Sequence, residues 1–227
     1  MADLKSVFEN IAITNKWGSE ESRSGAGSTL SYTYNLRHEL ETIVSKFEIA
    51  TLFDAPCGDF NWMKAVSFPA GMKYIGGDIA STLVRANKLS HASASRDFIE
   101  FDIAKDRFPD CDMWFCRDCL FHLSFESIFQ ALSGFCESGA KYVMMTNHLN
   151  TSRFRNRDIQ SGDFRRLDFH LKPFKFPRKV LYLVPDYVFP FPRREMCIWS
   201  RAQIMAALNA TSRRLIGNND HERRRPL

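Results

Sequence analysis

Short apolar runs alternate along the middle of the chain with segments in which apolar residues recur every three or four positions. Runs of this kind are typical of buried strands, and the second spacing is typical of helices that pack one face onto a sheet. The runs predict strands at 50–54, 73–78, 98–102, 112–117 and 141–147. The helical spacing predicts helices between them, at about 60–66, 81–92 and 124–137. Alternating strands and helices favour an α/β fold with a mostly parallel sheet and helices on both faces.

The two ends of the chain extend this pattern. Beyond residue 150, the apolar segments 179–184 and 195–199 predict two terminal strands, one of them antiparallel, which brings the sheet to seven strands. The first 47 residues are expected to hold a helix at 3–14, a Ser/Gly-rich loop at 17–28 and a second helix at about 30–47.

Length and composition indicate a single globular domain over residues 1–227. The chain is 44% hydrophobic and 25% charged, which is ordinary for a soluble protein. No apolar run approaches the roughly 20 residues of a membrane span, and the N-terminus lacks the apolar centre of a signal peptide. The six cysteines show no disulfide-framework spacing, so we expect reduced thiols and a cytoplasmic location.

Acidic residues end three of the predicted strands. Asp54, Asp78 and Asp102 should meet at one edge of the sheet, because parallel strands end on the same side. Ligands of α/β sheets bind at this edge, outside the carboxyl ends of the strands. The turn after Asp54 contains Pro56 and a single glycine, Gly58, whose missing Cβ lets the backbone approach a ligand closely. The spacing of 24 residues from Asp54 to Asp78 is about that of a ribose-binding carboxylate in nucleotide-binding β-α-β units. These features predict a nucleoside-containing cofactor.

The same turn argues against a dinucleotide. A pyrophosphate-binding turn carries several glycines, whereas this one carries Gly58 alone between the carboxylates of Asp54 and Asp59. Carboxylates repel a pyrophosphate but suit a ligand with an ammonium and a sulfonium group. Over residues 40–148 the chain resembles the class I S-adenosylmethionine-dependent methyltransferases, whose first motif is a strand ending in an acid followed by a glycine-bearing turn. Their second motif, an acid closing the next strand, matches Asp78.

The resemblance implies a Rossmann-like class I methyltransferase fold with S-adenosylmethionine as its cofactor. It also implies where the cofactor is held. The expected contacts are the three strand-ending acids and residues that follow the first, third and fourth strands, namely Asp54, Pro56, Gly58, Asp59, Trp62, Asp78, Asp102, Ile103, Arg117 and Asp118.

Methyltransferases of this class commonly fold an N-terminal segment over the cofactor as a lid. The resemblance therefore implies cofactor contacts for Trp17, Ser24 and Gly25, although a Ser/Gly-rich run of this kind is also typical of a plain connector. We accordingly divide the domain into an N-terminal helical and lid segment (1–47), a catalytic core (48–210) and a basic, flexible tail (211–227).

Two histidines are candidates for the catalytic base. The fourth strand is followed by His122 and Leu123, and many class I methyltransferases have a similar His-Leu pair that would face the substrate. Imidazole suits proton removal near neutral pH, and His148 at the end of the fifth strand is the second candidate. A purely structural role for His122 fits equally well. Cys116 and Cys119 with His122 lack the second ligand pair of a zinc site, so no metal is expected.

Charge is unevenly distributed along the chain. Residues 151–227 hold 17 Lys and Arg against 7 Asp and Glu, whereas residues 1–150 hold 14 against 19. A basic half that overhangs the cofactor would receive an anionic substrate. Arginine recognises phosphate and carboxylate well, so the candidates for substrate binding are Arg153, Arg155, Arg165 and Arg166. A solvated basic surface is the alternative.

These observations together predict a methyltransferase that O-methylates a small or glycan-like anionic acceptor. A nucleic-acid or protein N-methyltransferase is the first alternative. A non-catalytic nucleic-acid-binding protein of the same fold, whose tail Arg223–Arg225 contacts phosphates, is the second, although the arginines are not interleaved with an aromatic stacking platform. A silent cofactor-binding module is the third.

Overall fold

One seven-stranded sheet organises the molecule. The computed structural model describes residues 3–222, with side chains up to Thr211. The strands are β1 (Thr51–Asp54), β2 (Lys73–Asp78), β3 (Arg96–Glu100), β4 (Met113–Cys116), β5 (Tyr142–His148), β6 (Tyr182–Pro185) and β7 (Arg194–Ser200). Their order is β3-β2-β1-β4-β5-β7-β6, and β7 runs antiparallel to both β5 and β6, whereas the other neighbouring pairs are parallel. The predicted α/β fold with a mostly parallel, seven-stranded sheet is confirmed.

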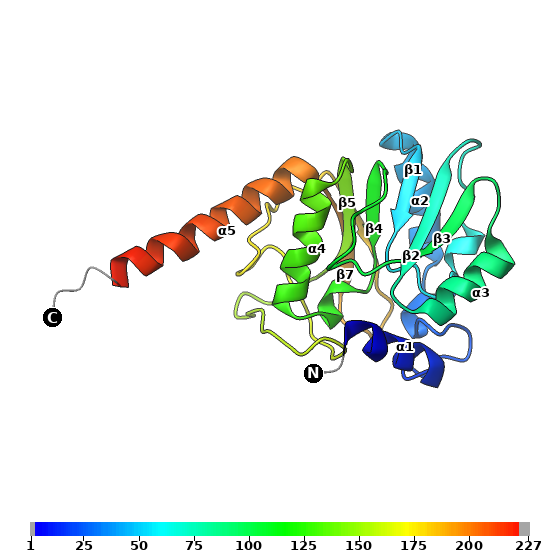
Figure 1. Ribbon diagram of the computed structural model, residues 1–227, viewed down its shortest axis with the longest axis horizontal. Coiled ribbons are helices and arrows are strands. Elements are labelled where there is room, and N and C mark those ends of the chain that lie inside the picture. The colour runs from blue at the N-terminus through cyan, green and yellow to red at the C-terminus, as the bar shows by residue number, and fades with distance from the viewer. Residues whose placement is uncertain (1–2, 223–227) are drawn as a thin grey trace.

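Helices cover both faces of this sheet (Figure 1). They are α1 (Leu4–Thr14), α2 (Tyr34–Lys46), α3 (Ser81–His91), α4 (Phe125–Glu137) and α5 (Arg201–Glu222). Apolar side chains of α2 and α3 pack on one face, and those of α4 and the first turns of α5 pack on the other. Helix α1 belongs to neither layer. Leu4 and Phe8 on its apolar side pack at the edge of the core that lies between the sheet and helices α4 and α5.

The start of α4 shows how the sequence sets an element boundary. The side chain of Ser124 accepts a hydrogen bond from the backbone N–H of Ser127, which caps the helix as expected. Leu123 before the cap and Ile128 within the first turns are both buried, as in a hydrophobic staple. The cap fixes where the chain turns after β4, and this turn carries His122.

The helix predicted at 60–66 is wrong, because the structure holds only the 3-10 helix η2 (Met63–Ala65) there. Phe60 has a left-handed φ of 57°, which interrupts helical geometry at the start of the segment, and Pro69 follows soon after it. Helix α2 packs on the same face of the sheet and begins at Tyr34 rather than near residue 30.

Helix α5 continues to Glu222 and projects away from the sheet (Figure 1). It therefore crosses the boundary at 210–211 where we expected a flexible tail to begin, because residues 201–211 contain good helix formers such as Ala, Met and Leu. The rest of the predicted tail, including Arg223–Arg225, lies outside the described residues.

Within residues 3–222, none of the helices combines the length and the apolar character that crossing a bilayer requires.

Candidate functional site

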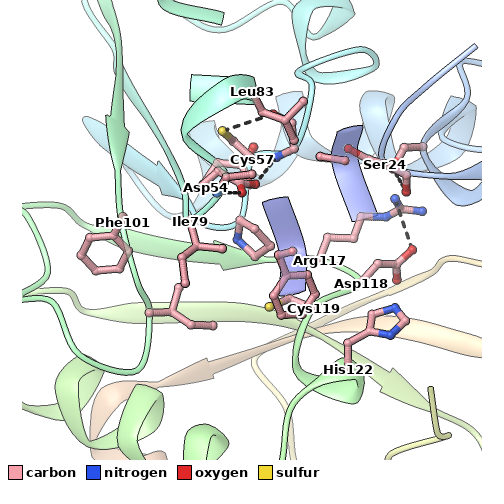
Figure 2. Close-up of a pocket in the computed structure, with 18 of the residues that line it drawn as sticks. Ser24, Asp54, Cys57, Ile79, Leu83, Phe101, Arg117, Asp118, Cys119 and His122 are labelled. Carbon is pink, nitrogen blue, oxygen red and sulfur yellow. Dashed lines mark hydrogen bonds and ion pairs between the residues drawn. The ribbon is translucent and has the colours of Figure 1, made fainter. Parts of the chain in front are cut away.

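A cavity lies at the carboxyl ends of β1, β2 and β4, between the sheet and the N-terminal segment (Figure 2). Most of the residues predicted to hold the cofactor line it together. These are Trp17, Ser24, Asp54, Pro56, Gly58, Trp62, Asp78, Asp102, Ile103, Arg117 and Asp118. In Figure 2, Phe101 and Ile79 lie toward one end of the cavity, and Asp118 and His122 lie toward the other.

Part of the apolar wall was not predicted. Leu4 and Phe8 of α1, Leu83 of α3 and Phe101 after β3 all contribute to the cavity. Their only signal in the sequence is helical or strand spacing, which indicates burial without saying whether a side chain faces the core or a ligand. The wall gives the cavity an apolar region beside its carboxylates.

Asp54 ends β1 as a buried carboxyl. It is 3% exposed, and the Tyr74 hydroxyl donates a hydrogen bond of 2.6 Å to its Oδ2. Burial raises the pKa of Asp54 to about 8, and the hydrogen bond from Tyr74 only partly offsets this effect. In the free protein, Asp54 therefore holds a proton at neutral pH.

Asp78 fixes the geometry of the turn after β1. Its Oδ2 accepts the backbone N–H of Gly58, and its Oδ1 accepts that of Ala80, both at 2.9 Å. Burial raises the pKa of Asp78 to about 6, and these two N–H donors act in the opposite direction. The carboxylate ties β1 to β2 at the point where both strands meet the cavity.

Asp102 follows β3 rather than ending it, because β3 stops at Glu100. Asp102 Oδ1 accepts the backbone N–H of Ala104 at 3.0 Å, and Oδ2 lies 3.3 Å from Lys105 Nζ. Asp102 and the adjacent Ile103 still line the cavity, because the chain after β3 turns across its edge.

Asp59 and Gly25 do not line the cavity, contrary to expectation. The Asp59 carboxylate accepts hydrogen bonds from the Ser22 and Ser24 hydroxyls and from the backbone N–H of Arg23. Asp59 thus fastens the N-terminal segment to the loop after β1, and these hydrogen bonds occupy its oxygens. Gly25, with φ of 90°, backs onto the Trp17 side chain.

A second contact strengthens this attachment. The Asn61 side-chain amide donates to Glu21 Oε1 at 2.8 Å and to the backbone oxygen of Ser28 at 3.1 Å. Gly58 allows the close approach, because a Cβ on it would lie 2.0 Å from Ser24 Oγ. The segment that carries Trp17 and Ser24 therefore lies over the cavity and is held there by the turn after β1.

Arg117 and Asp118 belong to a cluster of four charges, in which Asp118 is partly exposed and Arg117, Asp186 and Arg194 are buried. Arg117 donates two hydrogen bonds to Asp186, from Nε at 2.9 Å and from Nη2 at 3.1 Å. Arg194 Nη2 donates to Asp118 Oδ2 at 2.6 Å, and Arg117 Nη1 lies 3.5 Å from the same oxygen. The charges of the two arginines and two aspartates cancel. The cluster joins the end of β4 to the β6–β7 hairpin and lets Arg117 stack 5.4 Å from the Trp62 ring.

His122 stands at the cavity with one ring nitrogen engaged. Its Nδ1 lies 2.8 Å from the backbone oxygen of Asp163, and a carbonyl only accepts, so Nδ1 carries the proton. This tautomer leaves a lone pair on Nε2. The Trp17 ring stacks on the imidazole at 5.4 Å, and burial lowers the pKa of His122 from its usual range. A neutral, oriented imidazole at the cavity is suited to accept a proton.

His148 lies outside the cavity. The Phe121 ring separates it from His122. The centroid of this ring lies 5.0 Å from that of the His148 ring and 4.6 Å from that of the His122 ring. His148 Nδ1 accepts the backbone N–H of Leu167, and burial lowers its pKa to about 4. The enclosed position and the occupied Nδ1 favour a structural role.

The four predicted substrate arginines also lie away from the cavity lining. Arg155 donates to the backbone oxygens of Ser152 and Phe154, and Arg166 lies over the Phe154 ring. Arg165 is buried and donates to the backbone oxygen of Phe121, whereas Arg153 is exposed. Three of the four therefore mark an outer surface that follows β5 rather than a contact inside the cavity.

No protein-family model and no curated protein sequence matches the chain, but several solved structures have a similar fold. N-methyltransferase NodS from Bradyrhizobium japonicum with S-adenosyl-l-homocysteine superposes with a TM-score of 0.61 at 9% identity, over 84% of this chain and 98% of NodS. Magnesium protoporphyrin IX methyltransferase from Synechocystis with S-adenosylmethionine gives a TM-score of 0.55 at 11% identity, over 88% and 98%. The chain has the class I methyltransferase fold.

A third structure extends this likeness to a longer protein. Human N-acetylserotonin methyltransferase in complex with S-adenosylmethionine has a TM-score of 0.51 at 13% identity, over 86% of this chain and 59% of its own. The likeness confirms the fold that the resemblance in sequence implied. In class I methyltransferase folds, as in other α/β sheets, the ligand site lies at the carboxyl ends of the strands, where the cavity of this chain is found.

Proposed function

We propose that this protein is an S-adenosylmethionine-dependent methyltransferase that binds its cofactor in the cavity at the ends of β1, β2 and β4. The observation that carries the proposal is the pair of buried carboxyls, Asp54 and Asp78, in that cavity within a class I methyltransferase fold. The solved structures of this fold include complexes with S-adenosylmethionine and S-adenosylhomocysteine.

The cavity residues fit this cofactor. Asp78 would accept hydrogen bonds from ribose hydroxyls, and Asp54 would meet the ammonium group. The apolar wall that includes Leu83 and Phe101 suits the adenine ring, with Asp102 beside it. Trp17 and Ser24 would cover the bound cofactor as parts of a lid.

When bound, the cofactor supplies a methyl group on a positively charged sulfur. The protein's own contribution would be to align an acceptor oxygen with that group and to remove its proton. His122 is the base that the geometry supports, because the bond from Nδ1 to Asp163 points the Nε2 lone pair away from that carbonyl. Trp17 limits rotation of the ring by stacking on it.

For the acceptor we propose a small or glycan-like anionic molecule that is methylated on oxygen. Arg153, Arg155 and Arg166 lie on the exposed surface that follows β5, and Phe164, 56% exposed, lies 5.8 Å from the His122 ring. An exposed aromatic face suits a sugar ring, and arginines on the same side of the chain's β5 end suit its carboxylate or phosphate.

A methyl-transfer screen tests this function. Purified protein with radiolabelled S-adenosylmethionine should transfer label to at least one member of a panel of uronic acids and sugar phosphates. Matched uncharged sugars serve as controls, and product masses would locate the methyl group on oxygen or nitrogen. Transfer confined to an amine, as with the N-methyltransferase NodS, would contradict the O-methyl assignment, and transfer confined to uncharged sugars would contradict the anionic acceptor.

A further inference from the structure

Asp54 is a carboxyl at the cavity wall, and no cation among the described side chains forms an ion pair with it. Arg117, the cation whose charge acts on it, is engaged by Asp186. None of the ion pairs formed within residues 3–211 includes Asp54. Its Oδ2 accepts the Tyr74 hydroxyl, whereas Oδ1 receives no hydrogen bond and is not among the enclosed unpartnered atoms. Oδ1 is therefore the oxygen that the cavity can reach.

Tyr74 is fixed so that its hydroxyl stays on this carboxyl. It lies on β2 opposite Leu52 of β1 and is itself buried. Its ring packs against Phe60 at 5.1 Å, Phe98 at 5.9 Å and Phe68 at 6.2 Å between centroids. Aromatic contacts on several sides restrict the rotation of the tyrosine ring. The hydroxyl therefore stays bonded to Oδ2, and Oδ1 is the oxygen that can change its partner when a ligand binds.

The groups that face Asp54 favour its protonated form until a cation arrives. Burial raises the pKa of Asp54 most and the negative charge of Asp78 raises it further, whereas the Tyr74 hydrogen bond and the Arg117 charge lower it by less. The neighbouring thiols of Cys57 and Cys116 have pKa values raised by burial, so both stay neutral and add no further negative charge beside Asp54. A positive group at Oδ1 would therefore favour the ionised form of Asp54.

We propose that Tyr74 is a positioning residue that presents Asp54 Oδ1 to the cavity, so that the ammonium group of the bound cofactor replaces a proton on this oxygen. This inference rests on the proposed function. The proton leaves the carboxyl for the solvent, the ammonium keeps its charge, and the complex gains one ion pair. Cofactor binding is therefore coupled to the release of one proton.

Titration calorimetry with S-adenosylhomocysteine measures this release directly. At pH 7, the apparent enthalpy should differ between phosphate and Tris buffers by an amount that corresponds to about one proton released per ligand bound. Asp54→Asn keeps an acceptor for Tyr74 but has no acidic proton, so its release should fall to near zero. 5′-Methylthioadenosine, which lacks the ammonium group, should release none from the wild-type protein.

Tyr74→Phe isolates the positioning role. Loss of a hydrogen bond to an ionised group should weaken S-adenosylhomocysteine binding roughly tenfold or more. It should also move the upper pH limit of proton release to a higher pH, because the ionised form of Asp54 has lost a donor. Tyr182→Phe is the matched control, since its hydroxyl also binds a carboxylate, Glu39, but outside the cavity. This control should bind like wild type.

The outcomes separate the two proposals. Binding without a buffer-dependent enthalpy, or equal proton release by Asp54→Asn and wild type, overturns proton coupling and leaves the proposed function standing. Wild-type affinity and pH dependence in a folded Tyr74→Phe variant overturn the positioning role. Failure of the wild-type protein to bind S-adenosylhomocysteine at any pH overturns both proposals.

Discussion

At the scale of single residues, Gly58 couples the first strand to the segment that covers the cavity. Its φ of 57° disfavours any L side chain, and the adjacent Ser24 hydroxyl leaves no room for a Cβ. The same residue gives its backbone N–H to Asp78. Gly58 therefore shapes both the turn at the proposed cofactor site and the fit of the N-terminal segment.

Gly58→Ala should lower both stability and cofactor affinity. The left-handed backbone conformation costs roughly 1–2 kcal/mol for a non-glycine residue, and the displaced Ser24 loses its contact with Asp59. We expect a lower melting temperature and a several-fold weaker affinity for S-adenosylhomocysteine by calorimetry. Gly71→Ala is the matched control, because Gly71 has a φ of 86° but a Cβ at this position would meet no atom within 4 Å. It should lower the melting temperature without changing affinity.

His122→Ala should reduce turnover by roughly 100-fold while leaving cofactor affinity almost unchanged. Burial lowers the pKa of His122, so Nε2 keeps its lone pair at pH values below the usual pKa of imidazole. The midpoint of the decline in turnover at low pH, measured with the acceptor found in the screen, should therefore lie below the ordinary imidazole pKa of about 6.5. His38→Ala, away from the cavity, serves as the control. Near-normal turnover of His122→Ala would assign His122 a structural role.

At the scale of elements, the N-terminal segment and the turn after β1 act as one unit. The Asp59 carboxylate binds the segment at Ser22–Ser24, and the Asn61 amide reaches its far side at Ser28. Cofactor enclosed beneath this unit would have to enter or leave by loosening it. The attachment should then control access to the cavity.

Trypsin cleavage after Arg23 reports on this attachment. Saturating S-adenosylhomocysteine should slow the cleavage of the wild-type protein several-fold, because a ligand bound beneath the segment stabilises its closed position. Asp59→Ala should be cleaved faster in the absence of ligand, whereas Asp97→Ala, an exposed control paired with Lys88, should behave like wild type. Equal cleavage rates with and without ligand would show that the segment is a connector and not a lid.

Sequence spacing predicted the strands well and the connection at 60–66 poorly. The strand ends at Asp54 and Asp78 were predictable, because apolar runs stop where the chain leaves the sheet. The left-handed φ of Phe60 was not, because a bulky apolar residue carries no local signal for this conformation. Helical spacing alone could not distinguish a helix from a buried turn there.

At the scale of the whole molecule, the site depends on contacts between distant parts of the chain. Asp186 and Arg194 complete the charge cluster around Arg117 and Asp118, yet nothing in their local sequence indicates these partners. The partners of Asp59 were unpredictable for a related reason, since a sequence pattern does not show which groups a carboxylate in a turn will bind. Strand-end acids were predictable because the topology of a parallel sheet brings them together.

The buried carboxyl of Asp54 should also shape stability as a function of pH. Its pKa is about 8 in the folded protein, against an ordinary value of 3.8 for an aspartate in contact with water, so the folded state binds more protons between these values. Stability should therefore fall as pH rises from 7 to 8, by about 1 kcal/mol. Asp54→Asn should remove this slope in denaturant unfolding measured at both pH values. An unchanged slope would contradict a protonated Asp54.

The central claim is that the cavity binds the methyl-donor cofactor, and calorimetric titration with S-adenosylhomocysteine tests it most directly. We predict a dissociation constant in roughly the micromolar range for the wild-type protein. Asp78→Ala should weaken binding by roughly 1.5–3 kcal/mol, the value of a hydrogen bond to a charged group. Binding of NAD without binding of S-adenosylhomocysteine, or an unchanged affinity in Asp78→Ala, would contradict the account.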